Sequence, residues 1–97
     1  MSRWYAVIRT RGAKWDRRAP LRSQALWNEH ATFTDGLETA GLIRLAGPLE
    51  GDDVLLICRG DSPEAIEARL ADDPWTAADM LHTTRISAWN VLVGELE

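Results

Sequence analysis

The chain has 97 residues, the size of a single domain, and its apolar fraction of 45% is typical of a globular protein. Its net charge of −4 argues against general nucleic-acid binding, which needs a broad positive surface, and no apolar run is long enough to cross a bilayer. The lone cysteine, Cys58, excludes an internal disulfide and fits a reducing compartment, so we expect a cytoplasmic protein without a membrane or nucleic-acid partner.

The charge is unevenly distributed along the chain. Residues 1–22 have a net charge of +6, whereas residues 23–97 have a net charge of −10. Residues 4–9 are rich in side chains that favour strands, which predicts the first strand. The polar segment 10–20 contains glycine and proline and predicts a loop. Because the basic segment is local, an anionic partner is expected to be small.

Residues 21–40 have the apolar spacing of a helix. One stripe along this segment recurs at helical intervals and consists of Leu26, His30, Phe33 and Leu37. Ser23 is a candidate N-cap. Gly41 occupies the place of a C-terminal cap glycine, which takes a positive φ without a Cβ clash. The stripe predicts that the His30 ring points towards the core.

The rest of the chain predicts three strands and a second helix. Residues 42–46 and 54–58 are apolar and bounded by turn residues, which favours strands. Residues 62–71 begin with serine, proline and glutamate, which is typical of a helix start. A short turn follows, and residues 83–93 predict the last strand region, with a bend near Trp89-Asn90.

The order strand–helix–strand–strand–helix–strand predicts an α+β domain. Four strands would form one antiparallel sheet with both helices on the same face. A sheet with one wet face should alternate apolar and polar residues, yet residues 4–9 and 54–58 are apolar on both sides. We therefore expect a second copy of the chain to cover the other face, which makes the protein a homodimer.

Several short motifs resemble the YCII-related family. They are Trp27-Asn28-Glu29-His30-Ala31-Thr32-Phe33, Leu37, Gly41, Gly47-Pro48-Leu49, Asp73-Pro74-Trp75 and Ile86-Ser87-Ala88-Trp89. The similarity covers residues 27–93, which is nearly everything except the first strand and the basic loop. It implies that residues 1–97 form a single YCII-like domain with a ferredoxin-like βαββαβ fold. It also implies dimerisation through the sheets, in the dimeric α/β barrel arrangement.

The resemblance further implies that His30 and Asp73 are the active pair. Imidazole exchanges a proton near neutral pH, so His30 is a candidate general acid or base. The alternative for His30 is a core histidine satisfied by one hydrogen bond. The alternative for Asp73 is the cap of a short helix that begins at Pro74. Both roles of Asp73 are compatible, because one carboxylate oxygen can cap while the other orients the ring.

Other residues are candidates for ligand binding. Trp27, Trp75 and Trp89 could form the wall of a pocket for a flat ligand, and the alternative is packing in the core or at the dimer interface. The basic loop could be a lid whose arginines bind a carboxylate or phenolate, with Arg17 and Arg18 as the candidate binding residues, and the alternative is a solvated surface. The basic side chains of this loop are Arg9, Arg11, Lys14, Arg17, Arg18 and Arg22. Two distant histidines and one cysteine give no metal-ligand spacing, so neither a metal nor a cofactor is expected.

These residues predict a cofactor-independent enzyme that acts on a small cyclic or aromatic anionic compound. His30 would transfer the proton and Asp73 would orient it, which suits isomerisation, elimination or hydrolysis. The alternative is a non-catalytic dimeric module that binds a small molecule or scaffolds a partner. Turnover distinguishes the two, because a binding module returns its ligand unchanged.

Overall fold

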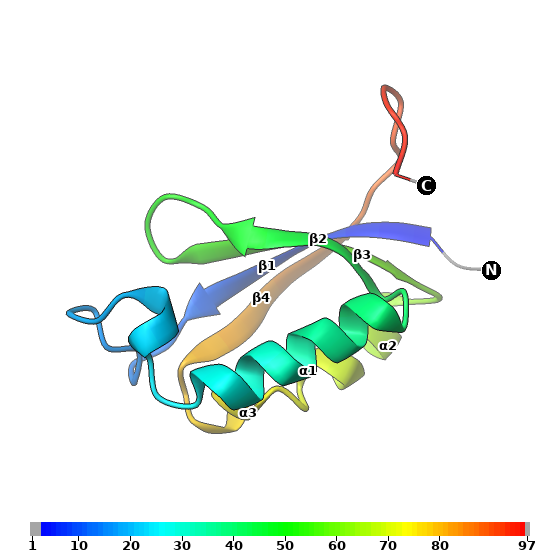
Figure 1. Cartoon of the computed structure of the whole chain (residues 1–97). Helices are drawn as coiled ribbons and strands as arrows, with labels where there is room; N and C mark the ends of the chain where they lie inside the picture. Colours follow the sequence, from blue (N-terminus) through cyan, green and yellow to red (C-terminus); the bar gives the residue numbers. More distant parts are fainter. Residues whose placement is uncertain (1–2, 97) are drawn as a thin grey trace.

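The computed structural model describes residues 3–96. Its elements are β1 (Arg3–Arg11), η1 (Leu21–Ser23), α1 (Trp27–Thr39), β2 (Ile43–Pro48), β3 (Asp53–Gly60), α2 (Pro63–Leu70), α3 (Pro74–Ala77) and β4 (Leu81–Ala88). The strands form one antiparallel sheet in the order β2–β3–β1–β4, and the helices lie on one face of it (Figure 1). The predicted α+β class and antiparallel sheet are confirmed. None of the helices formed by residues 3–96 is long and apolar enough to span a membrane.

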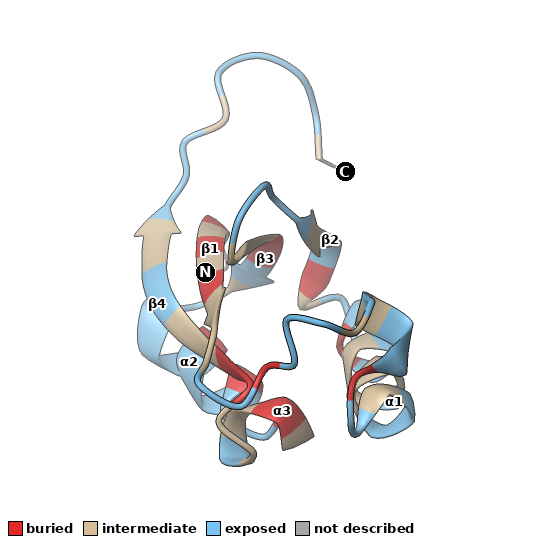
Figure 2. Cartoon of the chain, turned by 90° about the vertical axis from the view of Figure 1, so that its left-hand side faces the viewer, coloured by how far each residue is buried: buried red, intermediate tan, exposed pale blue. Residues whose placement is uncertain are grey.

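The core lies between the sheet and the helical layer. Its main cluster consists of Tyr5, Val7, Leu37, Ile43, Leu56, Cys58, Ile66 and Leu70. A second cluster lies where α3 meets the sheet and consists of Trp15, Trp75, Met80 and Leu81. Figure 2 colours by burial and shows buried positions on β1, β3 and α3, the elements that contribute to these clusters. Burial raises the pKa of the Cys58 thiol to about 12, so this cysteine is a protonated core residue.

Two helix ends agree with the caps predicted from the sequence. The Ser62 hydroxyl accepts a hydrogen bond from the N–H of Ala65 at 3.1 Å, and Pro63 begins α2. Gly41 follows α1 with a φ of +85°. Its neighbour Leu42 donates its N–H back to Leu37, as expected for a helix that ends in the left-handed region. These caps depend on contacts between residues close in sequence.

The predicted helix over residues 21–40 is wrong in its first part. Ser23 belongs to the single turn of η1, and the backbone is extended at Gln24 before Leu26 adopts a φ of 62°. The Gln24 side chain holds this bend, because its amide group bonds both the N–H and the carbonyl of Asp16. Leu26 consequently leaves the predicted stripe and is 40% exposed.

The predicted last strand over residues 83–93 is also shifted. β4 starts two residues earlier and stops at Ala88. The N–H of Trp89 donates to the carbonyl of Trp4 at 2.9 Å, close to the start of β1. Beyond Trp89 the chain runs away from the sheet on the side opposite the helices (Figure 1). Leu92 and Val93, expected in the strand, are therefore exposed.

Candidate functional site

A cavity of about 200 Å³ opens between the sheet and the helices α1 and α3. Most of its wall is apolar, with side chains such as Trp15, Trp27, Phe33, Val54, Leu56 and Leu81. The ionisable side chains in the wall are fewer and consist of Arg9, Arg11, His30 and Asp73. An apolar hollow with a few converging polar groups is the usual form of a small-molecule site.

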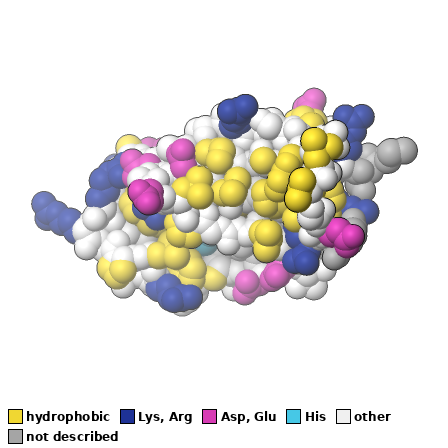
Figure 3. All heavy atoms as spheres, turned by 90° about the horizontal axis from the view of Figure 1, so that it is seen from above, with side chains coloured by type: hydrophobic (Ala, Val, Ile, Leu, Met, Phe, Trp, Pro, Cys, Tyr) yellow, Lys and Arg dark blue, Asp and Glu magenta, His cyan; other side chains and the backbone are white. Residues whose placement is uncertain are grey.

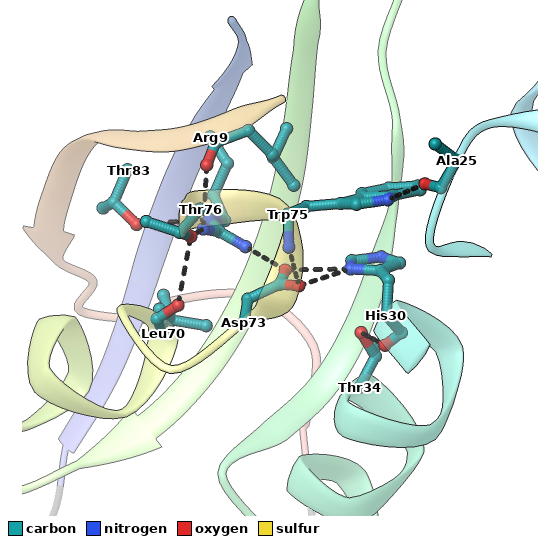
Figure 4. Close-up of polar contacts among 10 residues, drawn as sticks. Arg9, Ala25, His30, Thr34, Leu70, Asp73, Trp75, Thr76 and Thr83 are labelled. Carbon is teal, nitrogen blue, oxygen red and sulfur yellow. Dashed lines mark hydrogen bonds and ion pairs between the residues drawn. The ribbon is translucent and has the colours of Figure 1, made fainter. Parts of the chain in front are cut away.

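His30 and Asp73 meet at this cavity. The His30 Nδ1 lies 2.8 Å from one carboxylate oxygen of Asp73 and 3.0 Å from the other (Figure 4). The His30 side chain is 14% exposed, whereas that of Asp73 is 1% exposed. Asp73 also caps α3, since its Oδ1 accepts the N–H of Trp75 at 3.0 Å. The capping role and the contact with the histidine therefore occur together.

The ionisation of Asp73 determines which nitrogen of His30 is free. Burial raises the pKa of Asp73, but hydrogen bonds from His30, the Trp75 N–H and Arg9, together with the charge of protonated His30, hold it below its ordinary value. An ionised carboxylate only accepts hydrogen bonds, so the His30 Nδ1 donates. In the neutral ring, Nε2 is then unprotonated, and it has no hydrogen-bond partner within residues 3–96. Nε2 is available as a base.

Trp75 fixes the plane of the histidine ring. The two rings stack with centroids 3.6 Å apart and an interplanar angle of 10°. The Trp75 indole N–H donates to the carbonyl of Ala25 at 2.7 Å, which anchors the indole to the bend before α1 (Figure 4). The centroid of the Trp27 ring lies 5.9 Å from the centroids of both the His30 and the Trp75 rings. The structure thus places Trp27 and Trp75 beside His30 in the cavity wall.

Arg9, which the sequence offered only as one arginine of the basic loop, bonds directly to the site carboxylate. Its Nη1 donates to Oδ2 of Asp73 at 2.8 Å, and its Nη2 donates to Thr76 Oγ1 at 2.5 Å and to the carbonyl of Leu81 at 3.3 Å. Its Nε donates to Thr83 Oγ1 at 3.2 Å (Figure 4). Burial lowers the pKa of the Arg9 guanidinium, and the hydrogen bond and charge of Asp73 oppose that shift. The site is therefore a row of Arg9, Asp73 and His30.

Three other predicted site residues do not reach this cavity. Trp89 is 42% exposed and lines a separate hollow at the end of β4. Arg17 forms an ion pair with Asp52 on the surface, and its side chain is 60% exposed. Arg18 is also exposed. The arginine of the basic segment that does line the cavity, besides Arg9, is Arg11.

One signal in the sequence could have set Arg9 and Arg11 apart from the other arginines of the basic loop. In a strand, side chains two residues apart point to the same face. Tyr5 and Val7 are buried against the helices, so Arg9 and Arg11 continue along the same inner face of β1. An arginine that continues a buried apolar register indicates a buried ion pair or a polar site.

Neither a metal centre nor similarity to a known protein indicates what the site does. Within residues 3–96, no group of three or more His, Cys, Asp or Glu side chains is arranged to hold a metal ion. Comparison of the chain with protein-family models, with curated proteins and with solved structures found no match. The function therefore has to be inferred from the geometry of the cavity and the residues that line it.

Proposed function

We propose that the cavity is the active site of a cofactor-independent enzyme that acts on a small cyclic or aromatic anionic compound. His30 is the general acid or base, and Asp73 is the residue that positions it. The observation that carries the proposal is the His30–Asp73 hydrogen bond at 2.8 Å, which leaves Nε2 free at a largely apolar cavity. A placed imidazole of this kind contributes roughly 10²–10⁴-fold to a rate.

The pair supports reactions that move one proton. Nε2 takes a proton from a carbon or hydroxyl of the bound compound, and the Asp73 carboxylate stabilises the imidazolium that forms. In an isomerisation, the electron pair of the broken C–H bond shifts along the ring and the proton returns to a different carbon. In an elimination, the proton goes to the leaving group. Stacking on Trp75 and the hydrogen bond to Asp73 keep the imidazole ring of His30 in one orientation throughout the reaction.

Membership of the YCII-related family is part of this proposal. The motifs around His30 and Asp73 support it. The element order βαββαβ and the sheet order β2–β3–β1–β4 are consistent with the ferredoxin-like fold that the resemblance implies. The cofactor-independent chemistry follows from the pair itself, because neither residue needs a metal to move a proton.

We also propose that two copies pair through the face of the sheet opposite the helices. Side chains that alternate with the core residues point to that face and include Ala6, Ile8, Leu55 and Ile57. Leu45 joins them because a register shift in β2 places it opposite Ile57. Figure 3 shows hydrophobic side chains gathered there. Leu45 is 54% exposed in the single chain, so its side chain is accessible to a second copy.

Sedimentation at micromolar concentration is expected to give about twice the 10.9 kDa mass of the chain. A charge on this face should prevent pairing, because burying it without a counter-charge is unfavourable. Leu45→Glu is therefore expected to sediment as a monomer with unchanged circular dichroism. A wild-type chain that sediments at the single-chain mass would contradict the dimer.

The catalytic role of His30 is tested by turnover. A panel of small ring carboxylates, including enol lactones and unsaturated ring acids, is incubated with the protein and followed by absorbance and proton NMR. We expect His30→Gln to lower kcat/KM for any compound that is converted by at least about 100-fold. The matched control is His82→Gln, because His82 forms a similar pair with Asp79 at 2.5 Å but on the surface, 43% exposed.

Two results would count against the enzyme. If His82→Gln lowers turnover as much as His30→Gln, the activity does not depend on the cavity. If compounds bind at the cavity but return unchanged in every case, the chain is a binding module of the kind that the sequence left open.

A further inference from the structure

Two arginines on β1 face the cavity, and they use their guanidinium groups differently. Each of the three side-chain nitrogens of Arg9 donates to a protein acceptor, among them Asp73 and Thr83. Arg11 uses Nη1 alone, which donates to the carbonyl of Gly51 at 3.3 Å. Arg9 is therefore a structural partner of Asp73, while Arg11 keeps most of its donors available.

The available donors of Arg11 form one edge of its guanidinium. Its Nε is buried and has no hydrogen-bond partner within residues 3–96, and Nη2 makes no hydrogen bond to that part of the chain either. In a planar guanidinium, the Nε–H and one Nη2–H point in parallel along the same side. A buried donor is normally paired, so the buried and unpaired Nε of a residue that lines the cavity indicates that a ligand supplies the acceptor.

Trp15 holds this edge in place. The guanidinium carbon of Arg11 lies 4.4 Å from the centroid of the Trp15 ring, and Trp15 is itself 8% exposed. Stacking on an aromatic face fixes the plane of the guanidinium and keeps water away from one side of it. The donors are therefore held in a fixed orientation before a ligand arrives, which reduces the entropy lost on binding.

We propose that the Nε/Nη2 edge of Arg11 is the anion-recognition element of the cavity and that its ligand is a ring compound bearing a carboxylate. Two parallel N–H donors match the two oxygens of a carboxylate, and the pair forms two charge-assisted hydrogen bonds. The apolar wall of the 200 Å³ cavity takes the ring. This inference rests on the proposed function and specifies which residue selects the substrate.

The charges around Arg11 favour an anion there. Asp52 is a carboxylate on which the charge of Arg11 acts, and its pKa is lowered by a hydrogen bond and the charge of Arg17 and, to a lesser extent, by the charge of Arg11. Its hydrogen bond goes to Arg17, so these three residues together carry one net positive charge. Asp73 is bonded by Arg9 and His30. An incoming carboxylate therefore meets no unpaired negative charge in the cavity wall.

The test uses benzoate and benzamide, which have the same shape and differ in charge. Each is titrated into ¹⁵N-labelled protein while the indole N–H signals of Trp27 and Trp75 are followed, since both rings line the cavity. Wild-type protein is expected to bind benzoate at least about tenfold more tightly than benzamide. Arg11→Gln is expected to lose about tenfold in benzoate affinity, with benzamide affinity unchanged within about twofold.

Three further variants distinguish the two-donor edge of Arg11 from a general effect of positive charge. Arg11→Lys keeps the charge but not the two-donor edge, so it should fall between wild type and Arg11→Gln, and it serves if the glutamine variant unfolds. Arg17→Gln removes one of the two arginines that the sequence favoured for anion binding, and Arg69→Gln removes an exposed charge on α2. Both are expected to keep the preference for benzoate.

Each outcome bears on a different claim. Loss of the benzoate preference in Arg17→Gln instead of Arg11→Gln would overturn the assignment of Arg11. Equal affinity of the wild-type protein for both probes would also overturn it, but would leave the cavity as a ligand site. If neither probe shifts the signals of Trp27 and Trp75, the carboxylate inference fails together with the proposed active site.

Discussion

Replacing Arg9 with methionine is expected to lower the free energy of unfolding by about 3–5 kcal/mol, the usual effect of removing one partner from a buried ion pair. The Arg9 and Asp73 side chains are 3% and 1% exposed, so the remaining carboxylate stays out of water. Methionine fills the space of the arginine stem, which limits the effect to charge and hydrogen bonds. Urea unfolding at pH 7, followed by tryptophan fluorescence, measures the difference.

The matched control is Arg17→Met, which removes an arginine from an exposed ion pair. The side chains of Arg17 and Asp52 are 60% and 43% exposed, and water screens such pairs. The expected loss is therefore below about 1 kcal/mol. A similar loss in the two variants would show that Arg9 contributes through its stem and not through its buried charge. A small domain has a total stability of only about 5–15 kcal/mol, so the larger effect should be easy to detect.

The caps of the helices could be predicted because they depend on neighbouring residues. Ser62 and Gly41 act within a few positions of where they stand. The bend before α1 could not, because the Gln24 side chain bonds the backbone of Asp16, eight residues away. The end of β4 is also set at a distance. Pairing stops near Trp89 because the partner strand β1 begins there, whatever the apolar character of the residues that follow.

The residues of the candidate site were also predicted only in part. The helical spacing and the family resemblance pointed to His30 and Asp73, which lie in contact. Arg9 and Arg11 were not singled out from the basic loop because β1 is apolar on both faces, so alternation alone did not tell which face meets the helices. Arg17 and Arg18 were chosen from charge alone, and a loop arginine has no periodicity that fixes its direction.

Asp73→Asn is expected to lower the free energy of unfolding at pH 7 by about 1.5–3 kcal/mol, as for a lost hydrogen bond to a charged group. The pKa of Asp73 in the folded protein lies below its value of about 3.9 in an unfolded chain. A depressed pKa stabilises the fold above the unfolded value, and this contribution disappears as the pH falls through the folded value. The difference in free energy of unfolding between wild type and variant should therefore be largest above about pH 5 and should shrink below about pH 4.

Urea unfolding at pH 7, 5, 4 and 3 measures that gap. Asp52→Asn is the control, because the carboxylate of Asp52 is exposed and its pair with Arg17 is screened by water. The free energy of unfolding of this control should differ little from that of the wild type at any of these pH values. A gap for Asp73→Asn that stays constant or widens towards pH 3 would mean that Asp73 is not stabilised as a carboxylate.

The same variant should also move the proton on His30. The carboxylate of Asp73 accepts from Arg9, from the Trp75 N–H and from the His30 Nδ1, whereas an amide has one oxygen for these three donors. If that oxygen serves Arg9 and the helix cap, the amide nitrogen faces His30 and donates to Nδ1. The ring hydrogen then shifts to Nε2, which no longer acts as a base. Long-range ¹H–¹⁵N spectra of the neutral ring distinguish the two tautomers, and a variant that keeps its hydrogen on Nδ1 would contradict the positioning role of Asp73.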